Sequence, residues 1–106
     1  MEYHPDVWII LKMSSEEYGD IYKILAGWYG GYLGGDSWQL NSGIESVTEE
    51  SDDVIAFKGF SGSVYLCHKQ TERFSGLTQS IYAHMVETAT KGGASVEVIE
   101  YKDLKL

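Results

Sequence analysis

The sequence has very little of several residue types, and each shortage excludes a class of protein. Its 106 residues include one cysteine, Cys67, so an intramolecular disulfide and a zinc site built from paired cysteines are both excluded. The longest unbroken apolar run, Val7 to Leu11, is far shorter than the roughly 20 residues needed to cross a bilayer. The N-terminal residues lack the basic lead and apolar segment of a signal peptide. We therefore expect a cytoplasmic protein that does not contact membranes.

Positive charge is also scarce, with eight Lys and Arg against sixteen Asp and Glu and a net charge of −8. Residues 1–53 carry eleven acidic and two basic residues, a net charge of −9, whereas residues 54–106 carry five acidic and six basic residues, a net charge of +1. An acidic surface repels a phosphate backbone, so no direct contact with nucleic acid is expected. The charge fits a partner with a basic surface, or it simply keeps a small protein soluble.

Metal-binding and catalytic patterns are missing as well. The three histidines, His4, His68 and His84, show none of the close spacings typical of metal ligands, so no metal and no cofactor is predicted. A hydrolase using Cys67 would need a histidine nearby as base. On a regular strand Cys67 and His68 point to opposite faces, and a buried, inert thiol is the commoner case. We expect no catalytic residue, and an enzyme built on Cys67 remains the third hypothesis.

The alternation of apolar and polar residues predicts a single α+β domain over residues 1–106. The apolar run 6–13 predicts a strand buried on both faces. The capping-box pattern from Ser14 to Glu17 opens a stretch whose apolar residues recur every three or four positions up to Tyr29, which predicts a first helix.

The second half of the chain predicts further strands and one more helix. Strands are expected from residue 37 with a bend at 41–43, then over 54–60 and 63–69. A second helix is expected over 77–91, capped by Ser75 or Thr78 and ended by Gly92 and Gly93, followed by a last strand over 95–101. The order is β-α-β-β-β-α-β, a mostly antiparallel sheet with two helices packed on one face.

The stretch from Gly27 to Gly43 is the first candidate for a binding surface. Six of the twelve glycines and four of the fourteen aromatic residues lie in it. Glycine permits close approach of the backbone, and Trp and Tyr supply large rigid contact area. The predicted binding residues are Trp28, Tyr29, Tyr32, Trp38 and, as a polar anchor, Asp36. The alternative is that Trp28 and Trp38 cap the core.

Two other segments are candidate sites. The acidic turn Glu49, Glu50, Asp52 and Asp53 is predicted to meet a basic partner. A second set combines cations with hydroxyl groups that can hold an anion or small ligand. Its members are Lys58, Ser61, Ser63 and Arg73. An ordinary solvated turn is the favoured alternative for this second set.

The runs Leu25 to Ile44 and Phe57 to Lys69 resemble small uncharacterised accessory proteins of tailed phages and bacteria. The resemblance carries no fold or activity, but it implies a phage-type role in which a small acidic protein occupies a host enzyme, such as a defence nuclease. Our first hypothesis is therefore a non-enzymatic acidic binding module or inhibitor that docks on a host protein in the host cytoplasm. The second is a protein that binds or sequesters a small ligand or nucleotide with its glycine-rich segments. A homo-oligomer is compatible with both hypotheses.

Overall fold

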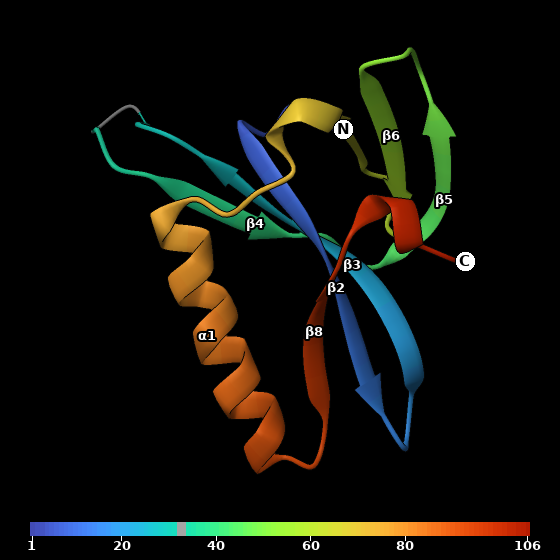
Figure 1. The fold of residues 1–106 in the computed structure, drawn as a ribbon, viewed down its shortest axis with the longest axis vertical. Coiled ribbons are helices and arrows are strands. Elements are labelled where there is room, and N and C mark those ends of the chain that lie inside the picture. The colour runs from blue at the N-terminus through green and yellow to red at the C-terminus, as the bar shows by residue number, and fades with distance from the viewer. Residues whose placement is uncertain (32–33) are drawn as a thin grey trace.

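The computed structural model describes residues 1–31 and 34–106, and it contains two β-sheets and one α-helix in that part of the chain (Figure 1). The helices are α1 (Gly76–Lys91) and two short 3₁₀ turns, η1 (Lys69–Thr71) and η2 (Tyr101–Asp103). The strands are β1 (Glu2–Tyr3), β2 (Val7–Ser15), β3 (Gly19–Trp28), β4 (Ser37–Leu40), β5 (Ile44–Glu49), β6 (Val54–Gly59), β7 (Val64–His68) and β8 (Ser95–Ile99).

The elements are arranged in three layers. The central sheet has the strand order β4-β3-β2-β8, with antiparallel pairing throughout. The outer sheet has the order β1-β7-β6-β5, in which β1 pairs with β7 in parallel and the other pairs are antiparallel. Helix α1 covers one face of the central sheet, and the outer sheet packs on its other face (Figure 1).

Strand β2 lies in the middle of this arrangement because both of its faces are apolar. Trp8 and Ile10 point toward the outer sheet and pack in the larger core cluster. Ile9 and Leu11 point the other way, into the cluster beneath α1. Alternate residues of a strand point to opposite faces, so a continuous apolar run serves two cores. The predicted strand over 6–13 and its burial on both faces are confirmed.

The predicted helix over 14–29 is wrong, because these residues form a hairpin and strand β3. Ser15 pairs with Gly19 across the hairpin, and the Ser15 hydroxyl accepts a hydrogen bond from the Tyr18 amide at 3.1 Å. Gly19 has φ of 70°, which closes the turn at little cost. In β3, Leu25 faces α1 while Ile24 and Ala26 face the outer sheet. Apolar residues on both faces of a strand produce the three-and-four spacing that was interpreted as a helix.

The helix predicted over 77–91 is confirmed, and Ser75 and Thr78 together form its capping box. The strand expected from residue 37 divides in two at Asn41–Gly43, so β4 joins the central sheet and β5 the outer one. The α+β class and the mostly antiparallel pairing are thus confirmed, whereas the first of the two helices and the β-α-β-β-β-α-β order are not. Within the described residues, α1 is too short and too polar to span a membrane.

Candidate functional site

The aromatic residues of the 27–43 segment divide between the core and the surface. Trp28 is half-buried, with its ring edge-on to Tyr3 at 6.3 Å and its indole N–H donating to the carbonyl oxygen of His4 at 3.0 Å. Trp28 therefore packs against the core, whereas the alternative interpretation had placed both Trp28 and Trp38 there. Tyr29 and Trp38 are 47% and 42% exposed and remain available for contact. Tyr32 lies outside the described residues.

Two carboxylates shape this segment by binding its backbone. Asp36 Oδ1 accepts a hydrogen bond from the Gly30 amide at 3.0 Å, and Asp6 Oδ2 accepts one from the Tyr29 amide at 2.8 Å. Asp36 thus links the segment before β4 to Gly30, which follows β3. Its predicted role in binding remains a prediction.

The acidic turn between β5 and β6 is exposed, but two of its four carboxylates have partners inside the molecule. Glu49 Oε1 lies 3.2 Å from Lys69 Nζ and accepts a hydrogen bond from the Tyr101 hydroxyl at 3.0 Å. These contacts hold the pKa of Glu49 below its usual value. Asp53 Oδ1 accepts from the Gln70 amide at 2.9 Å. The side chains of Glu50 and Asp52 form no hydrogen bond or ion pair with the described residues, so these two are free to meet a partner.

The predicted anion-binding set does not come together. Lys58 is exposed on the outer sheet and pairs with Glu45 at 3.7 Å, on the face opposite the buried Phe57. Arg73 donates to the carbonyl oxygen of Gln70 at 3.3 Å and lines a separate cavity beside Phe74. Ser61 and Ser63 line another cavity, and none of the described residues in its walls is cationic.

Cys67 is fully buried between the two sheets, and burial raises the pKa of its thiol far above the usual value. His68 is exposed, and His84 lies on the exposed surface of α1, beyond the central sheet. Neither histidine is placed to activate the thiol. Among residues 1–31 and 34–106, no group of three or more His, Cys, Asp or Glu side chains is arranged to hold a metal ion.

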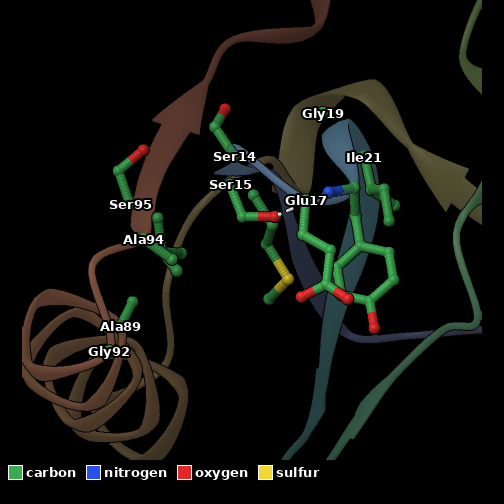
Figure 2. Close-up of a pocket in the computed structure, with 12 residues that line it drawn as sticks. Ser14, Ser15, Glu17, Gly19, Ile21, Ala89, Gly92, Ala94 and Ser95 are labelled. Atoms are coloured by element: carbon green, nitrogen blue, oxygen red, sulfur yellow. Dashed lines mark hydrogen bonds between the residues drawn. The ribbon is translucent and has the colours of Figure 1, made fainter.

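A surface groove lies between the C-terminal end of α1 and the β2–β3 hairpin. Its volume is about 410 Å³. Figure 2 shows Ala89 of α1 and Gly92, which follows the helix, on one side and Glu17, Gly19 and Ile21 on the other. We call this the hairpin groove. The residues that line it include Met13, Ile21, Ala89, Val96, Glu17 and Tyr18.

The hairpin groove combines an apolar floor with an acidic and aromatic rim. Met13 and Val96 belong to the core cluster beneath α1, so the floor continues the apolar face of the central sheet. Tyr18 is 73% exposed at the rim. No lysine or arginine is found among the described residues that line the groove. The side chains of Glu16 and Glu17 make no ion pair or hydrogen bond within residues 1–31 and 34–106.

Sequence reasoning missed this groove because it placed the hairpin turn in a helix. The overlooked signal is the short polar stretch from Ser14 to Asp20, which contains Gly19 and lies between two apolar runs. A loop of three to five residues with a glycine between apolar segments is typical of a β-hairpin.

No protein-family model, curated protein or solved structure matches the chain.

Proposed function

We propose that the protein is a non-enzymatic binding module that docks on a basic segment of a partner protein. In this proposal the hairpin groove receives an apolar side chain of that segment. The observation that supports it is the apolar floor and the acidic, aromatic rim in one concave surface. From the sequence we expect this partner to be a host protein and the present protein to be encoded by a phage.

The floor supplies binding energy that does not depend on charge. Burying one Leu or Phe side chain from the partner against Met13 and Val96 is worth about 1.5–3 kcal/mol. Tyr18 stands at the edge of the groove with most of its ring exposed. Tyrosine is among the residues that contribute most at protein interfaces, because its large ring loses little conformational entropy on binding.

The acidic residues select the neighbours of that apolar side chain. Glu16 and Glu17 are free to pair with Lys or Arg flanking it, whereas the nearby Asp20 is engaged with Ser14 at 2.7 Å and Lys12 at 3.7 Å. The net charge of −8 also attracts a basic partner at long range, which raises the association rate at low salt.

The β5–β6 turn is a second acidic surface, at the opposite end of the long axis from the β2–β3 hairpin (Figure 1). It has two free carboxylates, Glu50 and Asp52, whereas in the hairpin a free carboxylate, Glu17, lines an apolar groove. This difference favours the hairpin groove as the main contact. The two surfaces carry the same number of free acidic residues, so one can serve as the control for the other.

The test begins with selection of peptides from a random display library on the immobilised protein. We expect enriched peptides that combine an aromatic or leucine residue with adjacent Lys or Arg. The affinity of one enriched peptide is then measured by fluorescence polarisation at two salt concentrations. The wild type is compared with Glu16→Lys/Glu17→Lys, with Glu50→Lys/Asp52→Lys and with Ala89→Leu, which places a larger side chain in the groove from the side of α1.

The charge-reversed hairpin should bind at least about tenfold more weakly and should lose most of its salt dependence. The reversed β5–β6 turn should bind nearly as well as the wild type. Ala89→Leu should weaken binding by a similar factor at both salt concentrations, because the larger side chain occupies space in the groove and changes no charge. A loss confined to Glu50→Lys/Asp52→Lys would move the contact to the turn predicted from sequence, and the absence of basic peptides after selection would refute the proposal.

A further inference from the structure

The register of the central sheet shows which backbone groups of β3 and β2 face one another. Asn41 engages both the N–H and the carbonyl oxygen of Ile24, so residue 24 presents these groups to the β4 side of β3. Successive residues of a strand present their backbone groups to opposite sides, so those of Leu25 face β2. Leu25 pairs with Ile9, and the backbone groups of Ile10 therefore point away from β3, toward β8.

The same alternation leaves part of β8 without a partner. Ile10 pairs with Ile99, so the backbone groups of Ile99 and, two residues earlier, those of Glu97 bind β2. The N–H and carbonyl groups of Val96 and Val98 point the opposite way, out of the sheet. β8 is the last strand in the order β4-β3-β2-β8, and outside the strand pairs no described residue hydrogen-bonds to the backbone of either valine. Such an edge can accept an added strand.

The cavity beside Phe74 lies on the helix side of the same edge. Its volume is about 300 Å³, and its walls include Ile9, Phe74 and Val98. Ile9 and Phe74 pack in the cluster beneath α1, and Val98 pairs with Leu11 of that cluster. Val98 is 39% exposed. The residue of an added strand that stands opposite Val98 points to the same face of the sheet, so an apolar side chain there can enter the cavity.

Glu97 makes this edge selective for a basic residue. It lies between the two outward-facing valines, and its side chain points to the other face of the sheet. The Lys12 ammonium is 4.0 Å from Glu97 and 3.7 Å from Asp20, and the Glu97 side chain is 61% exposed. Across the open edge Glu97 takes part in the closely spaced type of pair, so a Lys or Arg opposite it lies beside its carboxylate. At the cavity, the charge of Glu72 offsets that of Arg73.

A second copy of the chain is a poor occupant of this edge. Residues 94–100 contain two glutamates and no lysine or arginine. Antiparallel pairing of β8 with β8 of a second copy over its whole length places Glu97 opposite Glu97. Like charges directly opposite each other destabilise a sheet. The net charge of −8 adds repulsion between copies, whereas a basic segment is attracted.

We infer that β8 receives an extended segment of a partner protein as an antiparallel fifth strand of the central sheet. Apolar residues of the segment stand opposite Val96 and Val98, the second of them in the cavity beside Phe74. A Lys or Arg between them stands opposite Glu97. The antiparallel direction is that of the other pairs in this sheet.

This inference goes beyond docking at the hairpin groove. Val96 borders both sites, but the cavity beside Phe74 shares no residue with the groove. A ligand can fill the groove without hydrogen bonds to the backbone of Val98, and a strand can pair with β8 while the groove stays empty.

The probe is the capped peptide Lys-Thr-Leu-Lys-Leu-Thr, whose leucines stand opposite the two valines and whose second lysine stands opposite Glu97. Amide hydrogen exchange is followed by NMR. In the free protein, the amides of Val96 and Val98 should exchange faster than that of Glu97, which binds β2. We expect a dissociation constant of about 1 mM or tighter. Peptide at ten times that concentration should slow exchange at both valines by about tenfold.

N-methylation of the peptide tests the pairing itself. In the antiparallel arrangement the leucine amides face β8, and the amide of the second lysine faces away. A methyl group on either leucine nitrogen should weaken binding by at least about tenfold, because it removes a hydrogen bond to β8. A methyl group on the nitrogen of the second lysine should weaken binding by less than about threefold.

Glu97→Gln tests the charge and should weaken binding of the unmodified peptide by about threefold at low salt. Glu87→Gln on α1 is the matched control, because Glu87 is also exposed and also pairs with one lysine, Lys91, at 3.3 Å. It should bind as the wild type does.

The inference fails if the peptide leaves exchange at the two valines unchanged, if methylation of the lysine nitrogen costs as much as methylation of the leucines, or if the two glutamine variants bind alike. Exchange at the valines that slows with protein concentration alone would assign the edge to a second copy instead. None of these measurements depends on the hairpin groove, which is tested separately with Glu16→Lys/Glu17→Lys.

Discussion

Asn41 ends the pairing of β3 with β4 by using its own side chain in place of a strand neighbour. The backbone N–H of Asn41 donates to the carbonyl oxygen of Ile24, and the side-chain oxygen of Asn41 accepts from the Ile24 amide. The main chain is therefore free to leave the central sheet and to continue as β5 in the outer one. A residue with an apolar side chain at this position would leave the buried Ile24 amide unpaired, at a cost of about 1–3 kcal/mol.

The burial of Cys67 determines the reactivity of its thiol. Only the thiolate reacts readily, and the raised pKa of this buried thiol keeps it protonated. In the native protein, alkylation of Cys67 by iodoacetamide should be at least about a thousandfold slower than in denaturant, because it requires unfolding. Mass spectrometry of timed samples measures both rates. Rapid labelling of the folded protein would revive the hypothesis of a cysteine enzyme.

The contact between β3 and the start of α1 depends on a residue without a side chain. A Cβ at Gly27 would lie 2.9 Å from Thr78 Cγ2 and 3.3 Å from Ser75 Oγ, the two residues of the helix capping box. We expect Gly27→Ala to destabilise the protein by about 1–3 kcal/mol, since the helix must move away from the sheet. Urea unfolding followed by fluorescence gives the free energy of unfolding.

Gly76→Ala is the matched control for this prediction, because Gly76 begins α1 and a Cβ there meets nothing within 4 Å. Alanine at that position should leave stability unchanged or raise it by up to about 1 kcal/mol. Equal stability of the two variants would mean that α1 does not pack against Gly27 as described.

The elements differ in how far local sequence determines them. Helix α1 is predictable because Ser75, the apolar stripe and Gly92 all signal the same helix, and each acts within a few residues. Strand β3 is not, because its apolar residues alternate between two cores that only exist once the outer sheet and α1 are in place. The binding surfaces follow the same division. Glu50 and Ser61 could be nominated from local composition, whereas the open edge at Val98 depends on the pairing of β8 with β2.

Across the whole molecule, Glu49 joins three distant parts of the chain. It lies on β5 and contacts Lys69 in η1 and Tyr101 in η2. Because these contacts lower its pKa, Glu49 stabilises the fold above the ordinary carboxyl pKa of 4.5, and that stability is lost as pH falls through the lower folded value. Glu49→Gln should therefore lose less stability than the wild type between about pH 5 and pH 2.

Urea unfolding at a series of pH values measures this dependence. Glu50→Gln removes one negative charge from the same turn, at a side chain that has no partner. Its plot of stability against pH should therefore parallel that of the wild type. The pH dependence of stability at Glu72 has the opposite sign. Burial raises the pKa of Glu72, so its contribution to stability is lost as pH rises through the raised value. Identical acid sensitivity in Glu49→Gln and Glu50→Gln would contradict the assignment.

The pairing of β2 with β8 has a consequence for synthesis on the ribosome. Ile10 pairs with Ile99, so one edge of β2 stays unpaired until residue 99 has been made. At about 5–20 residues per second, the interval is on the order of ten seconds. During that time β2 is held on one side by β3, and α1 is completed just before β8 emerges. The unpaired edge of an apolar strand is the part of a nascent chain most prone to associate with other chains. A chaperone that binds this protein as it is translated should therefore contact β2.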